Sequence, residues 1–180
     1  MQTPPHAARG AAAAAAAEAF SRNELLVEAT ALEAIRTLDA LCSHAEDGGA
    51  CAARIFPFIR RFGVDGFNRP SERTACPQRA CVFLGVMQFF LNHARVVTFD
   101  AAPIFRLFFL GYLPAHDADP FVAWSTLSFC ARNLRSLLHG ELSIFSRAFP
   151  AILRIGLAHP TSFVDQLVEL LPAMIGPESW

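Results

Sequence analysis

The stretch RACVFLGVMQFFLNH, residues 79–93, carries apolar side chains around nearly its whole circumference when it is wound as a helix. Phe83, Val86, Met87 and Phe90 fall on more than one face of that helix. A helix of this kind is buried on several sides, whereas a surface helix has a single apolar stripe. We therefore expect residues 79–93 to lie at the centre of a layer of helices.

The segment before this central helix has the one-sided pattern of a helix that covers it. From Glu24 onward, apolar side chains recur at every third or fourth position: Val27, Ala31, Ile35, Leu38 and Cys42. The pattern ends near Gly48 and Gly49, which are typical helix stops. These residues predict an amphipathic helix, and the following segment, with Pro57 inside it, predicts a brief or kinked one.

The segments after the central helix have recognisable start signals. Asp100 is placed to cap a helix whose expected buried residues are Phe105, Phe108 and Phe109, and which Gly111 and Pro114 close. Asp119 before Pro120 is a second start, and Gly140 is the matching stop. We predict one uninterrupted helix from Pro120 to His139.

The helix predicted from Pro120 to His139 has an apolar and a polar stripe. The apolar stripe is Trp124, Leu127, Cys130, Leu134 and Leu137. The polar stripe is Ser125, Ser128, Arg132, Arg135 and His139. Nine residues of helix place Cys130 and His139 about 180° apart and about 13 Å along the axis, so they cannot be a nucleophile and its base. Cys130 is expected in the core.

The fold class follows from the whole set of segments. No segment alternates as a strand does, and six or seven helices of about 10–20 residues joined by short Gly/Pro turns predict an all-α, ARM/HEAT-like α-solenoid segment. We assign residues 24–180 to this solenoid. Residues 1–23 are a low-complexity, alanine-rich leader that is disordered or partly helical, since alanine is the best helix former. A transit peptide is a second interpretation of the leader.

Composition excludes several classes of function. All 15 basic residues are arginines, so a phosphate-binding loop with its lysine and Schiff-base chemistry are both excluded. The formal net charge is −1 and the arginines are scattered except at Arg60 and Arg61, so no direct nucleic-acid binding is expected. No apolar run reaches the ~18–20 residues of a membrane span. The five cysteines have no C-x-x-C spacing and indicate reduced, mostly buried thiols.

The sequence offers no catalytic, cofactor-binding or metal-ligating constellation. The histidines are far apart and lack metal-ligand spacing, so no metal and no cofactor are expected. A small helical enzyme using Cys130 or His93 remains an alternative, as does a helical-repeat protein of another pathway. The candidate site residues are partner contacts on exposed surfaces: Arg60, Arg61, Arg132, Arg135 and His139.

Several stretches resemble the zeta subunit family of the fifth adaptor protein complex, in the family's order. They are LVEATALEAIRTLDALC (26–42), QFFLNH (88–93), FCARNL (129–134), HGELS (139–143), AFP (148–150) and FVDQLVELLPA (163–173). The resemblance implies a non-enzymatic solenoid subunit of endosomal traffic. Its implied partners are the beta, mu and sigma subunits and the spatacsin-like and spastizin-like proteins.

The same resemblance implies where the protein works. It implies a cytoplasmic protein held peripherally on late endosomes and lysosomes through its complex. The family is also associated with repair of DNA double-strand breaks by homologous recombination, which would place the protein in the nucleus as well. A repair scaffold is therefore the alternative function.

Overall fold

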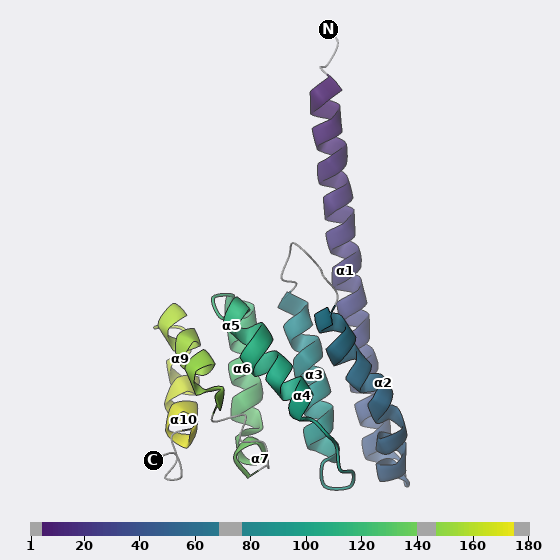
Figure 1. Cartoon of the computed structure of the whole chain (residues 1–180), viewed down its shortest axis with the longest axis vertical. Helices are drawn as coiled ribbons and strands as arrows, with labels where there is room; N and C mark the ends of the chain where they lie inside the picture. Colours follow the sequence, from purple (N-terminus) through teal and green to yellow (C-terminus); the bar gives the residue numbers. More distant parts are fainter. Residues whose placement is uncertain (1–4, 69–76, 140–146, 175–180) are drawn as a thin grey trace.

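The computed structural model describes residues 5–68, 77–139 and 147–174 (Figure 1). In chain order the elements are α1 (Pro5–His44), α2 (Gly48–Asn68), α3 (Pro77–His93), α4 (Ala102–Arg106), the π-helix η1 (Leu107–Tyr112), α5 (Leu113–His116), α6 (Pro120–Arg132), α7 (Leu134–His139), α9 (Phe149–Ala158) and α10 (Val164–Met174). These described ranges contain helices and no strand. The predicted all-α class is confirmed.

The helices stack in two layers (Figure 1). In one layer α1 packs on α3, α3 on α6, and α6 on α10. In the other, α2 contacts α4, and α5 contacts α9. Each helix thus contacts its near neighbours in the chain, which is the arrangement of a helical-repeat, solenoid-like fold. The predicted solenoid class is confirmed.

Helix α3 lies at the centre, as its all-round apolar sequence predicts. It packs against α1, α2, α4 and α6. Phe83, Val86, Met87, Phe89 and Phe90 are all buried. Burying one such side chain contributes about 1.5–3 kcal/mol relative to leaving it in water, so α3 is the main source of the core.

Aromatic rings join α3 to the second layer. Phe90 meets Phe56 of α2 at a ring-centroid distance of 5.1 Å, and Phe83 meets Phe108 of η1 at 5.8 Å. Tilted rings at these separations are worth about 0.5–1.5 kcal/mol beyond the area that they bury. The rings therefore hold the two layers together across α3.

The helix predicted to end at Gly111 and Pro114 continues instead through α4, η1 and α5. Phe105, Phe108 and Phe109 are buried, as predicted. The predicted cap by Asp100 is wrong, because the cap residue is Ala101 and no side chain accepts a hydrogen bond from the first turn of α4. Pro114 lacks an N–H, and the backbone N–H of Leu113 donates to the carbonyl of Phe108, five residues back. This π-type turn lets the helix pass through a proline.

The helix predicted from Pro120 to His139 is two helices. Its start is correct, because the Asp119 carboxylate accepts hydrogen bonds from the backbone N–H groups of Phe121 (2.8 Å) and Val122 (3.1 Å). Its continuity is wrong, because α6 ends at Arg132 and Asn133 has φ −107° and ψ 13°. The amide of Asn133 donates to the Phe129 carbonyl, which is how asparagine competes with the helical backbone. The predicted stop at Gly140 lies outside the described residues.

Helix α1 runs without interruption from Pro5 to His44. The predicted boundary between residues 23 and 24 therefore falls inside one helix. Among the side chains that the structure describes in α1, Glu28 is the first that is half-buried. Ile35 and Cys42 are buried as predicted, whereas Val27 is exposed. The division into a leader and a solenoid stays a prediction.

Candidate functional site

A groove of about 250 Å³ crosses the face of the layer formed by α1, α3 and α6. Its lining residues are Leu32, Ile35, Arg36, Asp39, Cys81, Leu84, Gly85, Gln88, Trp124, Ser125, Ser128, Phe129 and Arg132. The middle of the groove is the surface of α3, and α1 and α6 flank it. We call this surface the α3 groove.

Trp124 is the largest exposed side chain of the α3 groove, with 54% of its surface accessible. The sequence placed it on the buried stripe of α6 and placed Ser125 on the polar stripe, and both placements are wrong. Ser125 is 8% exposed and its hydroxyl lies 3.9 Å from the Cys81 thiol of α3. A small serine lets α6 approach α3 there, and this contact turns Trp124 outward. Leu127 and Cys130 are buried as predicted.

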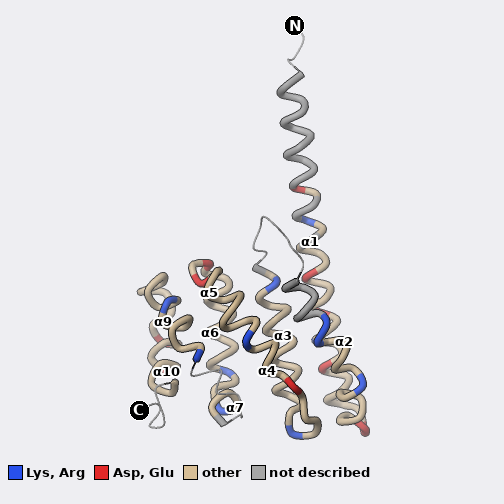
Figure 2. Tube along the Cα trace, viewed as in Figure 1, with Lys and Arg blue, Asp and Glu red and all other residues tan. Residues whose placement is uncertain are grey.

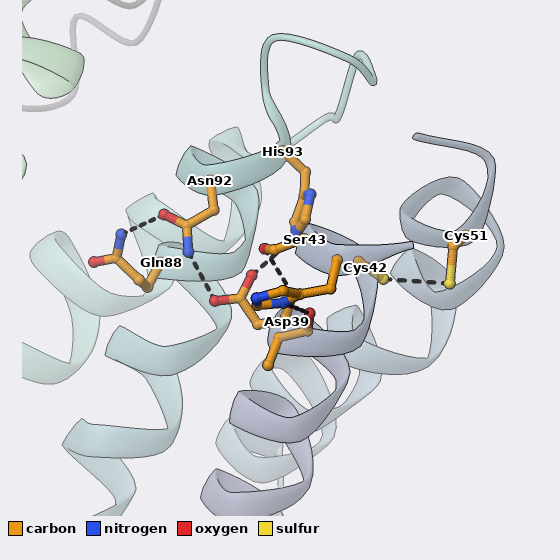
Figure 3. A network of polar contacts seen from close by, with 9 residues as sticks. Asp39, Cys42, Ser43, Cys51, Gln88, Asn92 and His93 are labelled. Carbon is orange, nitrogen blue, oxygen red and sulfur yellow. Dashed lines mark hydrogen bonds and ion pairs between the residues drawn. The ribbon is translucent and has the colours of Figure 1, made fainter. Parts of the chain in front are cut away.

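A chain of polar contacts ties α1 to the end of α3 beside the groove (Figure 3). An imidazole nitrogen of His93 lies 2.9 Å from one carboxylate oxygen of Asp39, and the amide of Asn92 donates to the other at 2.7 Å. Gln88 in turn donates to Asn92 at 2.8 Å. Both oxygens of Asp39 are thus engaged, so this carboxylate has an internal structural role.

The same chain of contacts reaches α6. Gln88 and Asn133 exchange hydrogen bonds through both of their amides, at 3.1 and 2.7 Å. Asn133 is 8% exposed, and a buried amide needs such partners. The contact fixes the end of α6 relative to α3, so the two walls of the groove are held by side chains of its middle helix.

The charges at the rim of the groove are mainly arginines. Arg36 is exposed and lies 3.9 Å from Glu33, a separation at which a surface ion pair is worth little. Arg132 is exposed and has no hydrogen bond or ion pair within the part of the chain that the structure describes. The groove is therefore lined by one arginine on the α1 side and one on the α6 side, together with the exposed Trp124.

The sequence-predicted contact residues fall into two groups. Arg60 and Arg61 lie on α2, half-buried and exposed respectively. Arg132 ends α6 and Arg135 lies on α7, one turn further along the chain. His139 is the last residue of α7, and its side chain is outside what the structure describes. Figure 2 shows the basic residues scattered along the described chain and not gathered in one patch.

Sequence reasoning missed most of the α3 groove. Trp124 and Arg36 were not predicted there, because a helix pattern alone does not say which neighbour covers which stripe. The one available signal was the cluster of polar residues, Gln88, Asn92 and His93, at the end of an otherwise apolar helix. Polar side chains on a central helix must find partners, and these ones mark the edge of the groove.

The thiols of α3 and α6 behave as core groups. Burial raises the pKa of Cys130, which is wholly buried, and burial also raises the pKa of Cys81. Both side chains are therefore protonated at neutral pH, a poor state for a nucleophile. Within the described residues there is no cluster of three or more His, Cys, Asp or Glu that could hold a metal ion. None of the described helices is long and apolar enough to cross a membrane.

Fold and groove define a helical-repeat, solenoid-like protein with an arginine-rimmed surface on one layer. A family model described as AP-5 complex subunit, vesicle trafficking, matches residues 26–154. The chain belongs to this family of adaptor complex subunits, and the resemblance noted in the sequence is confirmed.

One curated relative shows how much of the family protein is represented. The chain is 27% identical to AP-5 complex subunit zeta-1 of Mus musculus over 154 residues. The matched region is 83% of this chain but 17% of the mouse protein, so the chain spans less than one fifth of its relative's length. No solved structure matches the chain.

Proposed function

We propose that this chain is part of a non-enzymatic scaffold subunit of the fifth adaptor protein complex, of the zeta type, which acts in endosomal and lysosomal membrane trafficking and protein transport. The observation that carries the proposal is the family match over residues 26–154. That region extends from the second half of α1 into α9, so it coincides with the stacked helices. Residues 24–180 are the proposed solenoid unit, and residues 1–23 its leader.

The proposed mode of action is surface contact, not chemistry. The two side chains considered for catalysis are engaged in packing: Cys130 is wholly buried, and His93 is 4% exposed and held by Asp39. Neither has room for a substrate atom beside it. By contrast, the α3 groove offers exposed aromatic surface and arginine, two of the side-chain types that are enriched at protein interfaces.

The proposed partners are the other subunits of the complex, beta, mu and sigma, together with spatacsin-like and spastizin-like proteins. The proposed location is the cytoplasmic face of late endosomes and lysosomes, reached peripherally through the complex. Because the chain spans only 17% of the mouse relative, it holds a share of these contacts and not all of them. The alternative role in DNA double-strand-break repair receives no support from the family description or from the relative's name.

We assign the main contact to the α3 groove, with an acidic and apolar segment of another subunit as its occupant. Charge complementarity favours this occupant, because Arg36 and Arg132 line the groove together with Trp124. The carboxylate of Asp39, by contrast, is engaged inside the fold by Asn92 and His93. A carboxylate beside an arginine and an apolar side chain on the tryptophan would use both features. Arg135 and His139 would extend this contact along α7. The competing surface is α2, with Arg60 and Arg61.

The test is affinity purification of the chain, tagged at its C-terminus, from its own cells, followed by identification of the co-purifying proteins. We expect the other adaptor subunits with the wild type, and an about tenfold loss with Arg132→Glu, equivalent to about 1.4 kcal/mol. Arg61→Glu is the matched control, since Arg61 is also exposed but lies on α2.

Each outcome of this comparison has a clear meaning. If Arg61→Glu abolishes recovery and Arg132→Glu does not, the contact lies on α2 and the assignment to the α3 groove is wrong. If the folded wild-type chain recovers no adaptor subunit, the adaptor role itself is wrong. Thermal melting of each variant, followed by circular dichroism, identifies any loss that comes from unfolding, which exposed substitutions rarely cause.

A further inference from the structure

The thiols of Cys42 and Cys51 lie next to each other at the hairpin between α1 and α2 (Figure 3). Their sulfur atoms are 3.5 Å apart, although the two residues are nine positions apart in the sequence. Cys42 lies in the last turn of α1 and Cys51 in the first turn of α2. Both are free thiols.

The hairpin itself enforces this proximity. A β-carbon at Gly48 would collide with the backbone carbonyl oxygen of Cys42, so only glycine lets α2 begin this close to the end of α1. The backbone N–H of Gly48 donates to the carbonyl of Ala45 at 3.1 Å, and that of Cys51 donates to the carbonyl of Asp47 at 3.0 Å. The start of α2 is thus fixed, with Cys51 facing the last turn of α1.

The two thiols differ in access. Cys42 is 2% exposed, whereas Cys51 is half-buried and lines an open surface pocket with Asp47, Arg54 and Phe58. A small molecule from solvent can therefore reach Cys51 but not Cys42. This asymmetry is what a pair needs if one thiol is to meet an oxidant and the other is to resolve the product.

We propose that Cys42 and Cys51 are a redox-active pair that forms an intramolecular disulfide with a low-molecular-weight disulfide, of the glutathione type, as oxidant. A disulfide requires a sulfur–sulfur distance of about 2.05 Å, so the two sulfur atoms must approach each other by about 1.5 Å. The pair is independent of the proposed scaffold function, and it lies in α1 and α2, away from Arg132.

The reaction proceeds in two exchange steps. The Cys51 thiolate attacks one sulfur of the small disulfide, and the S–S bond breaks to release one small thiolate, which takes up the proton that Cys51 lost. Cys42 then loses its proton and attacks the Cys51 sulfur as a thiolate, which breaks the mixed disulfide and expels the second small thiolate; that thiolate takes up the proton. The two cysteines are oxidised by two electrons, and the small disulfide is reduced to two thiols.

The order of the two steps follows from the environment of Cys42. Burial, the hydrogen bond with Cys51 and the negative charge of Asp39 raise the pKa of Cys42 to about 11. Cys42 therefore loses its proton less readily than an ordinary thiol and is closed to solvent, so the accessible Cys51 begins the exchange. Closure needs the small fraction of Cys42 that is deprotonated and is therefore slow, in the range of minutes to hours for uncatalysed exchange.

The experiment uses the full chain in glutathione buffers of increasing oxidised fraction, followed by alkylation of the remaining thiols, digestion and mass spectrometry. Cleavage after arginine gives one peptide, residues 37–54, that contains both Cys42 and Cys51. We expect this peptide to lose the mass of two hydrogen atoms and to escape alkylation. Cys81 and Cys130 serve as internal controls and should be alkylated once the chain is unfolded.

Folding should favour the bridge. We expect the equilibrium constant for the disulfide to be at least about tenfold higher in the folded chain than in urea, since only the fold holds the thiols together. An equal or lower constant in the folded chain would overturn the proposal, as would oxidation of Cys81 or Cys130 before this pair.

Two variants separate the roles of the two thiols. In Cys42→Ser we expect oxidation to stop at a mixed disulfide between Cys51 and glutathione. In Cys51→Ser, which changes only a half-buried position, we expect no reaction at Cys42. A glutathione adduct on Cys42 in the Cys51→Ser variant would show that the oxidant reaches Cys42 directly, and it would contradict the proposal.

Discussion

Asp39 is the side chain on which the contact between α1 and α3 depends most. Its carboxylate oxygens lie within hydrogen-bond distance of the imidazole of His93 and the amide of Asn92. The His93 side chain is only 5% exposed. We expect Asp39→Ala to lower the free energy of unfolding by about 1–3 kcal/mol, because it leaves the buried imidazole of His93 without its partner. The urea midpoint of the purified chain measures this change.

The matched control for Asp39 is Glu33, on the same helix. Glu33 is largely exposed and lies 3.9 Å from Arg36. Replacing it with alanine should change the free energy of unfolding by less than about 0.5 kcal/mol. Equal midpoints for the two variants would mean that the Asp39 contacts contribute nothing net.

The buried thiols predict how stability changes at alkaline pH. Burial raises the pKa of Cys42 from 9.0 to about 11, and the pKa values of Cys81 and Cys130 are raised as well. Above pH 9 the unfolded chain therefore loses these protons before the folded chain does, so unfolding is favoured as pH rises toward 11. Below pH 9 the thiols are protonated in both states and the effect vanishes.

The sequence makes this alkaline effect easy to isolate. It has no lysine and one tyrosine, and arginine stays charged throughout, so thiols dominate the titration in this range. We expect the urea midpoint, measured with a reductant present, to fall between pH 9 and 11, and to fall less in Cys42→Ala. A midpoint that is flat or rises over this interval would refute the prediction.

Single-residue burial was predictable where one helix decides it. Cys130 and Leu127 lie on a stripe that faces the core whichever neighbour packs there, and both are buried. Trp124 and Ser125 lie at the margin of that stripe, where the contact with Cys81 of α3 decides which one turns inward. Such a contact joins residues 44 positions apart, and helical periodicity holds no information about it.

At the scale of elements, the two aspartates expected to cap helices make a controlled pair. Asp119 accepts two backbone hydrogen bonds at the start of α6, whereas no side chain caps α4 and Asp100 lies one residue before its cap position. We expect Asp119→Ala to cost about 1 kcal/mol of stability and Asp100→Ala to cost almost nothing. Thermal or urea unfolding of both variants checks this, and an equal loss would contradict the assigned caps.

Helix boundaries were predictable where their cause is local. Asp119 and Pro120 start α6 through neighbouring backbone groups, and the sequence shows this directly. At Asn133 the amide donates to the carbonyl of Phe129, four residues back, and also pairs with Gln88, 45 residues away. The second contact was not predictable from helical periodicity. Pro114 was expected to end a helix, but a single π-type turn and the burial of Tyr112 and Leu113 carry the helix through it.

At the scale of the whole molecule, the central position of residues 79–93 was predictable because an all-round apolar helix needs neighbours on several sides. The α3 groove was not predictable, because it lies between α1 and α6 and helical periodicity does not say how these two helices are placed relative to each other. The family relationship was visible in short stretches from residue 26 to residue 173. It identifies the class of protein, while the contact surface must come from the packed structure.

The exposed apolar residues of α9 and α10 predict self-association of the isolated chain. Leu153 and Leu157 are exposed on α9, and Val164 and Val168 on α10, each pair four residues apart and so on one face of its helix. Exposed polar residues are also present, Arg154 on α9 and Asp165 and Glu169 on α10, but the apolar side chains form a continuous pair on each helix. We expect sedimentation velocity to show oligomers that increase with protein concentration.

Paired charge substitutions test whether this surface is responsible. Leu157→Glu with Val168→Glu should shift the chain toward monomer, because two carboxylates cannot be buried at low cost in an apolar contact. Val96→Glu is the matched control, since Val96 is similarly exposed but lies in the loop after α3. If the wild type is a monomer with a sharp, cooperative melt, the exposed apolar residues of α9 and α10 do not cause self-association and the prediction is wrong. If all three proteins associate equally, another surface mediates the contact.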